Sequence, residues 1–312
     1  MIGSGNTDCE ALNRTFGAPE RIVFRPSLHD AAVAVLANQY GSAEVSLLGA
    51  QTISYRPTGN PPVLYMPRPY DANPAGSEIH GGIPVCWPWF GRCGEQGSKI
   101  HGLVRYAVWS VKGSEYSEDV TEVTLGISSS AETKKVWPYD FDLELKVTLS
   151  MKLTLQLRAK NTGKESFLVT EGFHPYLLVR SLDKVSVRGV DGCGFYDSRE
   201  LEKGYGRVWT GDYAPIAPGS KVYTVNRREY VLLDPGLKRA IAIVSRGNSK
   251  LVVWNPGPDD EQFRAVLGED GWNRFLCVEP ATLPRADGYM LAPGEEHTLT
   301  MAIQSVPEGA QN

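Results

Sequence analysis

The sequence predicts a mostly β protein, an antiparallel β-sandwich built as a single domain. Three observations support this fold class. A long segment alternates apolar and polar residues, and several short apolar runs are separated by turn clusters rich in Gly, Pro and Asn. The chain also lacks a sustained helical period and a regular alternation of strands with helices. Antiparallel sheets packed face to face satisfy all three observations.

The clearest periodic segment is "LELKVTLSMKLTLQLRAK", residues 143–160. Its apolar residues recur at every second position from Leu143 to Leu157, and Met151 is one of them. A period of two over this length is typical of half-buried antiparallel strands and not of a helix. We expect two paired strands with Ser150 near the turn.

Shorter apolar runs predict the other strands, and turn clusters such as "RPTGNPP" and "DPGL" separate them. These runs cover residues 21–27, 43–57, 121–128, 240–245, 250–256 and 297–303. The sequence lacks a Gly-, Ser- or Pro-rich linker, so we expect one domain over residues 21–306. Residues 1–20 are expected to be a loose extension and residues 307–312 a tail.

Composition excludes several classes of protein. The 312 residues carry 32 basic and 36 acidic side chains, a net charge of −4, which disfavours nucleic-acid binding. The five scattered cysteines lack a CxxC pair, so reduced thiols are expected. No signal peptide or membrane-spanning run is evident. We therefore expect a cytoplasmic protein that binds neither nucleic acid nor a membrane.

Aromatic and turn-forming residues are concentrated in "EIHGGIPVCWPWFGRCG", residues 78–94. Pro84 and Pro88 cannot donate to a sheet ladder, so this segment is not expected to be a central strand. Trp87 and Trp89 would project from a rigid path, and flat aromatic faces suit the apolar faces of a sugar ring. The alternative is a buried loop that closes one end of the sandwich.

Histidines and one glutamate are candidate site residues. His80 opens the aromatic segment, His101 follows it, and His174 lies in or near a strand, although any single histidine is more often structural. Metal-binding spacings such as HxH or HExxH are missing, so no metal site is expected. Glu279 ends the apolar run "FLCVE", where a carboxylate is costly unless it is satisfied or used; the alternative is a charge that reaches solvent.

Five motifs together resemble one family. In order along the chain they are "GGIPVCWPWFG", "HGLVRYAVW", "FHPYLL", "VVWNPGP" and "CVEPAT". Their order and approximate spacing are similar to those of the aldose 1-epimerase superfamily, and most of all to the hexose-6-phosphate mutarotases. The resemblance spans roughly residues 20–305.

This resemblance implies a fold and an activity. The fold would be a galactose-mutarotase-like β-sandwich, also called a supersandwich, with the sugar in an open cleft. The activity would be cofactor-independent exchange of sugar anomers by ring opening and re-closure. The family's acid matches His174 and its base matches Glu279. At ordinary pKa values the carboxylate is ionised at pH 7 and the imidazole is near its protonated form.

The sequence also departs from the family pattern. His80 stands where the family usually has Arg, Ile100 where it often has Gln, and Asn226 with Arg227 where it has an acidic segment. Of the arginines expected to hold a 6-phosphate, Arg105 is clearly retained. The planar guanidinium suits phosphate because it donates two parallel hydrogen bonds. His80 and Arg227 could supply replacement charge.

The sequence therefore predicts a monomeric mutarotase that acts on a hexose 6-phosphate, glucose 6-phosphate first, without a cofactor or metal. The sugar would be bound by His80, His101, Arg105, Trp87, Trp89 and Arg227. Two alternatives stay open: a mutarotase for a different aldose, and a carbohydrate-binding protein without catalysis. A glycosidase or lyase is less favoured because a second catalytic carboxylate is not evident.

Overall fold

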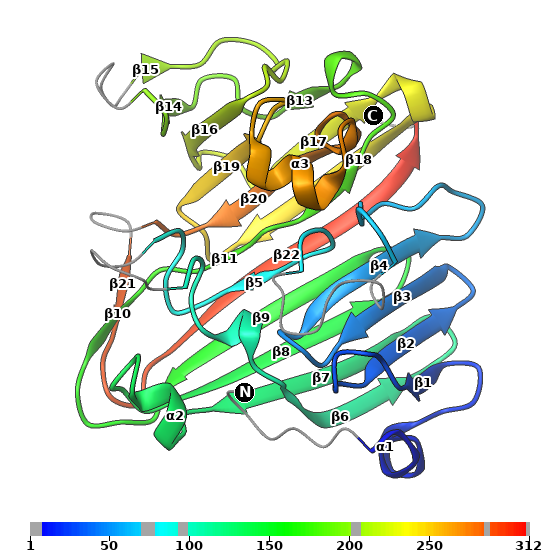
Figure 1. Cartoon of the computed structure of the whole chain (residues 1–312), viewed down its shortest axis with the longest axis vertical. Coiled ribbons are helices and arrows are strands. Elements are labelled where there is room, and N and C mark those ends of the chain that lie inside the picture. Colours follow the sequence, from blue (N-terminus) through cyan, green and yellow to red (C-terminus); the bar gives the residue numbers. More distant parts are fainter. Residues whose placement is uncertain (1–7, 70–78, 93–98, 201–206, 284–287, 310–312) are drawn as a thin grey trace.

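The chain folds into stacked antiparallel sheets, as the computed structural model shows (Figure 1). The structure describes residues 8–69, 79–92, 99–200, 207–283 and 288–309. Two sheets have eight strands each, and smaller sheets of four and two strands accompany them. The prediction of a mostly β architecture is confirmed.

The first large sheet follows the order β13-β17-β18-β22-β9-β8-β7-β6. Its strands in chain order are β6 (Ser110–Tyr116), β7 (Thr121–Ser128), β8 (Phe141–Leu149), β9 (Leu153–Asn161), β13 (Ser186–Arg188), β17 (Glu229–Asp234), β18 (Arg239–Arg246) and β22 (Glu296–Pro307). Strands β8 and β9 pair in register from Phe141 opposite Asn161 to Leu149 opposite Leu153. The predicted hairpin is therefore correct, with one exception: Met151 lies in the turn and is 64% exposed, because the alternation stops where the strands end.

The second large sheet follows the order β15-β14-β16-β19-β20-β11-β5, with β12 paired to β20. Its strands are β5 (Val85–Cys86), β11 (Gly172–Phe173), β12 (Tyr176–Leu178), β14 (Gly194–Asp197), β15 (Arg207–Val208), β16 (Gly219–Thr224), β19 (Lys250–Asn255) and β20 (Phe275–Ala281). The proline-flanked β5 is two residues long and lies at the edge of this sheet. This position agrees with the expectation that the aromatic segment is not a central strand.

The remaining elements extend and cover these sheets. The four-stranded sheet contains β1 (Ile22–Arg25), β2 (Val33–Asn38), β3 (Gly41–Ser46) and β4 (Gln51–Pro57), and the two-stranded sheet contains β10 (Phe167–Val169) and β21 (Tyr289–Leu291). The helices are α1 (Cys9–Phe16), α2 (Ala131–Lys134) and α3 (Glu261–Leu267), with 3₁₀ turns η2 (Val104–Tyr106), η3 (Leu182–Lys184), η5 (Pro235–Leu237) and η6 (Gly271–Arg274).

Helix α1 corrects the expectation of a loose N-terminal extension. Asp8 caps it by accepting hydrogen bonds from the backbone N–H groups of Glu10 and Ala11. Leu12 is 1% exposed and belongs to the main core, so burial fixes the helix against the sandwich. Residues 1–7 lie outside the described part of the chain.

The main core is shared by the two large sheets and the four-stranded sheet. It draws Leu145 and Leu155 from one sheet and Phe173, Val253 and Val278 from the other. Because side chains alternate across a strand, the neighbours of Val253 and Val278 point to the opposite face of the second sheet. That outer face carries the candidate site.

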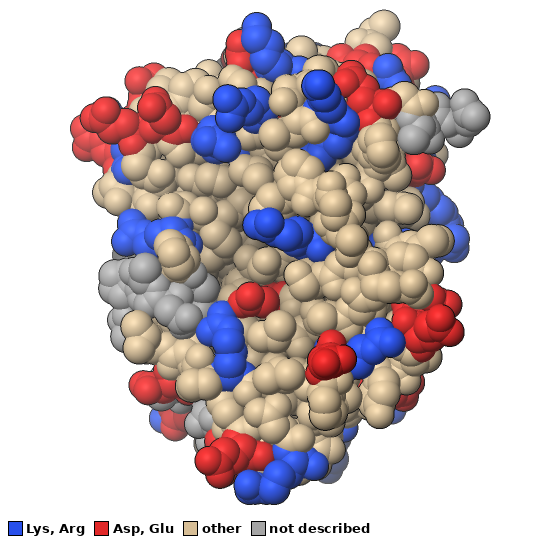
Figure 2. All heavy atoms as spheres, turned by 90° about the vertical axis from the view of Figure 1, so that its right-hand side faces the viewer, with Lys and Arg blue, Asp and Glu red and all other residues tan. Residues whose placement is uncertain are grey.

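Charged side chains on the surface are mixed in sign. Figure 2 shows basic and acidic groups interspersed over one face, without a continuous basic area among the residues drawn in colour. In the described part of the chain, every helix is too short or too polar to cross a bilayer.

Candidate active site

A cavity of about 1300 Å³ lies over the outer face of the second sheet. Strands β14, β16, β19 and β20 and the segment after β11 form its floor, and the segments around Phe90 and His101 form one wall. Helix α3 and the loop before it border the other side. The cavity is lined by His80, Phe90, Ile100, His101, Arg105, His174, Tyr176, Tyr196, Ser198, Arg199, Ser220, Val222, Val252, Trp254, Asn255, Gln262, Phe263 and Glu279, among others.

The alternation of β20 places Glu279 in this cavity. Every residue of the strand is buried; Val278 enters the main core, whereas Cys277 and Glu279 face the opposite side. The Glu279 residue is 1% exposed. The alternative that its charge reaches bulk solvent at a strand end is therefore wrong.

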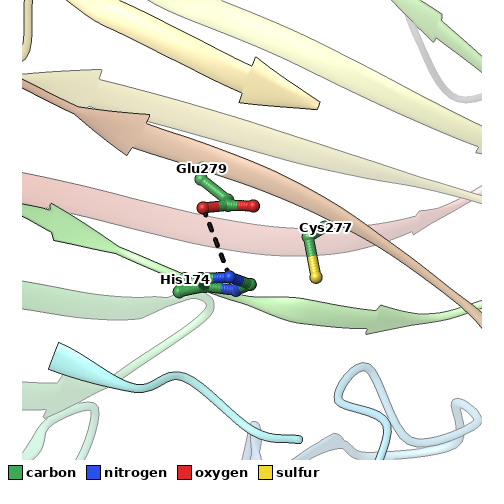
Figure 3. A group of neighbouring side chains, drawn as sticks. All are labelled: His174, Cys277 and Glu279. Atoms are coloured by element: carbon green, nitrogen blue, oxygen red, sulfur yellow. Dashed lines mark ion pairs between the residues drawn. The ribbon is translucent and has the colours of Figure 1, made fainter. Parts of the chain in front are cut away.

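His174 follows β11 directly and meets Glu279 across the floor. Its backbone N–H donates to the Pro84 carbonyl at 3.1 Å. Its Nε2 lies 3.5 Å from Glu279 Oε2, and the two side chains point toward each other (Figure 3). The structure thus brings together the two residues that the sequence suggested as acid and base.

Burial changes the charge state of both groups. Desolvation raises the pKa of Glu279 well above its usual value. Desolvation lowers the pKa of His174 well below its usual value, and the nearby His101 and Arg105 lower it further. The expectation of ordinary pKa values is therefore wrong: burial favours the neutral form of both groups, because neither charge is solvated.

His101 is held in an unusual backbone conformation with φ of 61°, in the left-handed region that non-glycine residues seldom adopt. The backbone N–H of Gly91 donates to His101 Nδ1 at 3.1 Å. Burial, together with Arg105, lowers the pKa of His101 to about 3, so the ring is neutral. With Nδ1 accepting, the proton lies on Nε2, which makes His101 a hydrogen-bond donor.

Arg105 and His80 also line the cavity, as predicted. Arg105 is 8% exposed, and its charge lowers the pKa of both His101 and His174. Arg105 and His101 line the same wall, and the His101 ring packs edge-on to His174 with centroids 5.2 Å apart, so this wall lies beside His174. The His80 ring contacts the Phe263 ring edge-on, with centroids 5.2 Å apart, at the α3 side of the cavity.

Trp87 and Trp89 do not line the cavity, which corrects their assignment to sugar binding. Trp87 is fully buried in the main core, with its ring centroid 4.5 Å from that of Phe141. Trp89 is 5% exposed and donates from Nε1 to the Lys99 carbonyl. Both rings close one end of the sandwich because apolar packing removes them from water.

Phe90, from the same segment, reaches the cavity instead. Its ring lies close against Gly172, where a Cβ would approach the ring carbons to 2.8 Å. Gly172 therefore permits this close approach. The aromatic segment thus contributes one ring to the cavity wall and two to the core.

Arg227 is also absent from the cavity lining. It is exposed in the connection between β16 and β17, and its carbonyl accepts a hydrogen bond from the Tyr230 hydroxyl. Neighbouring Asn226 accepts a hydrogen bond from the Cys193 thiol at 2.9 Å. Neither residue supplies charge to the site, whereas Ile100 does line it.

The sequence analysis missed several lining residues. The Trp254 ring packs edge-on to His174, with centroids 5.6 Å apart, and it faces the cavity together with Asn255. Both lie in the "VVWNPGP" motif, so the motif was a signal although its residues were not singled out. Tyr196 lies in "GFYDS", a further stretch that resembles the family, although the residue itself was not singled out. Arg199 and Gln262 carried no signal, because their approach depends on the fold.

His174, Cys277 and Glu279 are the one group of three potential metal ligands within the described ranges. Their ligand atoms lie within 4.8 Å of one another. Ligands about 2.0–2.3 Å from a tetrahedral zinc ion are roughly 3.3–3.8 Å apart, so this group is wider than a preformed zinc site. The proton chemistry proposed below uses no metal.

Comparison with known proteins places this chain in a family. The family model described as aldose 1-epimerase matches residues 33–304. A protein of Escherichia coli (strain K12), provisionally named glucose-6-phosphate 1-epimerase, is 31% identical over 83% of this chain and 86% of its own length. A protein of Cenchrus ciliaris with the same provisional name is 28% identical over 85% of this chain and 82% of its own.

Solved structures agree with this match. A Salmonella typhimurium protein, provisionally described as a mutarotase, superposes with a TM-score of 0.84 at 26% identity, over 92% of this chain and 94% of its own. A galactose mutarotase related enzyme from Lactobacillus acidophilus gives a TM-score of 0.71 at 15% identity, over 89% and 98% of the two chains. The fold is therefore the galactose-mutarotase-like sandwich.

Proposed function

Because this chain belongs to the aldose 1-epimerase family and is an isomerase, we propose that it interconverts the α and β anomers of a hexose 6-phosphate, glucose 6-phosphate in particular. One observation carries the proposal: Glu279 and His174 face each other at 3.5 Å on the floor of a large cavity. The two sugar oxygens that exchange protons in this reaction, O1 and the ring oxygen O5, are both bonded to C1. A closely spaced acid and base suits them.

The proposed chemistry needs one base and one acid. Glu279 accepts the proton of the anomeric hydroxyl O1 while His174 donates a proton to O5. The C1–O5 bond breaks and C1=O1 becomes an aldehyde. Rotation about C1–C2 presents the other face of the aldehyde to O5. The two proton transfers then run in reverse, so the ring closes as the opposite anomer and both residues return to their starting states.

The pKa directions define the protonation state of the pair. A raised pKa at Glu279 and a lowered pKa at His174 mean that the pair holds one proton over a wide pH range. Before a sugar binds, that proton lies on Glu279. When sugar hydroxyls donate hydrogen bonds to the Glu279 carboxylate, they favour its ionised form. The single proton of the pair then lies on His174, and this is the catalytic state.

The positions of the cations support a 6-phosphate. If O1 lies at Glu279 and O5 at His174, then C5 and C6 extend past His174, away from Glu279. This is the side on which Arg105 and His101 act on His174. Arg105 supplies the charge and the planar donor fork for phosphate, and His101 Nε2–H supplies a neutral hydrogen bond. Arg92 lines the cavity next to this wall.

The second candidate is a mutarotase for an unphosphorylated aldose. The family-pattern departures at His80 and Ile100, both of which line the cavity, favour it. A binding protein without catalysis is disfavoured, because the acid and base candidates face each other in the cavity. Action on a small sugar in the cytoplasm as a monomer, without nucleic acid or cofactor, remains part of the proposal.

The test is the rate of anomer exchange of glucose 6-phosphate, measured by saturation-transfer NMR with the spontaneous rate subtracted. We expect the wild type to accelerate exchange and Glu279→Gln to lose about 10²–10⁴-fold, because the amide cannot take the proton. Glu269→Gln, at a side chain that is 89% exposed, is the matched control.

Glucose and galactose measured beside their 6-phosphates separate the two candidates. Higher kcat/KM for the phosphorylated sugars supports the proposal, and equal values favour the unphosphorylated aldose. Wild-type exchange in Glu279→Gln would exclude the catalytic assignment. Saturable sugar binding without any acceleration by the wild type would identify a binding protein.

A further inference from the structure

We infer that the site has a subsite for a substituent at C2 of the sugar, and that the protein acts on 2-acetamido-2-deoxyhexose 6-phosphates as well as on plain hexose 6-phosphates. The inference rests on the proposed function, because it uses the orientation that the acid and base give to the ring. The subsite is formed by Val222, Val252, Tyr196 and Ser220.

The order of the strands arranges the side chains of the cavity floor in a row. Strands β14, β16, β19 and β20 lie side by side, and β11 follows β20. Val252 lies directly opposite Glu279, Val222 opposite Val252, and Tyr196 opposite Val222. Adjacent strands are about 4.8 Å apart, so these side chains form a row that leads away from Glu279.

A pyranose fits this row in one orientation. Equatorial substituents radiate within the mean plane of the ring, and the C1–O5 edge faces the Glu279–His174 pair. The substituent at C5 then extends past His174, toward Arg105. The substituent at C2 extends in the opposite direction, past Glu279, and comes to lie above Val252 and Val222. Arg105 at the C5 end supports this orientation independently of the C2 end, whereas Arg199, which follows β14, lines the cavity at the other end.

The side chains beyond Glu279 suit an acetamido group. Val222 and Val252 are 3% and 6% exposed and belong to a small apolar cluster on this face, separate from the main core. A methyl group would find apolar contacts there. The Tyr196 and Ser220 side chains border the same space, and Ser198 Oγ donates to Ser220 Oγ at 2.6 Å. These hydroxyls match the amide N–H and carbonyl of the substituent.

The size of the cavity agrees with an additional group. Its volume of about 1300 Å³ exceeds the roughly 300–1000 Å³ of common small-molecule sites. The additional volume does not lie only at the phosphate end of the cavity, because the lining continues over β19, β16 and β14.

The experiment compares anomer exchange of N-acetylglucosamine 6-phosphate and glucose 6-phosphate in the wild type, Val222→Phe and Val222→Ala. We expect wild-type kcat/KM values for the two sugars within about tenfold of each other. Val222→Phe fills the row, so the ratio of kcat/KM for the acetamido sugar to that for glucose 6-phosphate should fall at least tenfold. Val222→Ala, which keeps the space open, should change this ratio less than about threefold.

A binding measurement separates this inference from the proposed function. In Glu279→Gln, saturation transferred from the protein to the acetyl methyl protons of N-acetylglucosamine 6-phosphate should be strong, and Val222→Phe should remove it. That result supports the subsite even if the wild type exchanges neither sugar, an outcome that overturns the proposed function. Wild-type exchange of glucose 6-phosphate without exchange of the acetamido sugar, or equal losses for both sugars in Val222→Phe, would overturn the subsite.

Discussion

Two Glu–His pairs lie close together in this fold, on opposite faces of the second large sheet. Glu279 and His174 face the cavity, with 3.5 Å between Oε2 and Nε2. Glu171 and His297 lie on the core side, with 2.8 Å between Oε1 and Nδ1. Because side chains alternate along "EGFH", Glu171 and His174 point to opposite faces of one segment.

The two pairs consist of the same residue types, but their surroundings differ. The core-side pair joins the segment before β11 to β22 of the other large sheet, and the Tyr289 ring stacks on His297 with centroids 3.8 Å apart. The cavity-side pair is longer, and Glu279 Oε1 and His174 Nδ1 have no hydrogen-bond partner among the described residues. Glu171 Oε2 of the core-side pair has none there either, but the lining of the cavity includes only the Glu279–His174 pair. The first pair is occupied in holding two sheets together, whereas the second keeps atoms available for a substrate.

This contrast teaches that a buried carboxylate and imidazole do not by themselves make a catalytic site. Closure around the pair favours a structural role, since a substrate cannot reach a buried group that lies outside the cavity. An open cavity beside a pair with unmet hydrogen bonds favours a chemical role. Equivalent substitutions in the two pairs test this difference in role.

The largest effect is expected from His174→Asn beside His297→Asn. The first should lower kcat for glucose 6-phosphate exchange about 10²–10⁴-fold, because Asn cannot donate a proton to O5. The second should leave kcat within about threefold and reduce the free energy of unfolding. Saturation-transfer NMR and urea titration measure the two quantities. Equal loss of kcat in both variants would contradict the division of roles.

Arg105→Gln should have the next largest effect. Loss of a charged hydrogen bond, worth about 1.5–3 kcal/mol, should raise KM for glucose 6-phosphate roughly 10–100-fold. KM for unphosphorylated glucose should change less than about threefold, which makes glucose the internal control. An equal rise in KM for both sugars would show that Arg105 supports the fold of the site and does not bind phosphate.

Glu171→Gln should reduce the free energy of unfolding by about 1–3 kcal/mol, because the buried hydrogen bond between Glu171 and His297 is weakened. Its kcat should stay within about threefold of the wild type. Urea titration followed by tryptophan fluorescence gives the free energy of unfolding. A stable variant with strongly reduced kcat would place Glu171 in the reaction and remove the contrast between the pairs.

The smallest effect is expected from a change of pH. Activity falls on the acid side when His174 takes up a second proton, and on the basic side when Glu279 loses the last one. The lowered pKa of His174 and the raised pKa of Glu279 move these limits apart. His101, Arg105 and His80 face His174 and oppose its protonation. We expect kcat at pH 5.5 within about threefold of that at pH 7; a fall centred near pH 6.5 would indicate an ordinary imidazole.

Much of the fold could be predicted because strand periodicity is local. The alternation over residues 143–160 places β8 and β9 and identifies their inward faces. Short strands such as β2 and β17 were missed, since their four to seven residues carry too little pattern to separate from loops. The helix α1 was missed because its single buried residue, Leu12, finds its partners only in the folded sandwich.

Some residues of the site could be predicted from the sequence and others could not, for a similar reason. His174 and Glu279 could be found because motifs marked them, and His101 and Arg105 belong to another motif. Trp87 and Trp89 belong to a motif too, but the path of the backbone turns their rings into the core. Tyr196, Val222 and Val252 line the cavity through strand pairing, which residue order alone does not reveal.

The sequence by itself determined the β architecture, since periodicity is a property of the chain, and its resemblance to the family marked His174 and Glu279 as the candidate acid and base. Only the tertiary structure decided which of two Glu–His pairs faces a cavity, and which aromatic rings line it. The physical reason is that burial and the neighbours across strands set both pKa values and access. Those neighbours come from segments about a hundred residues apart.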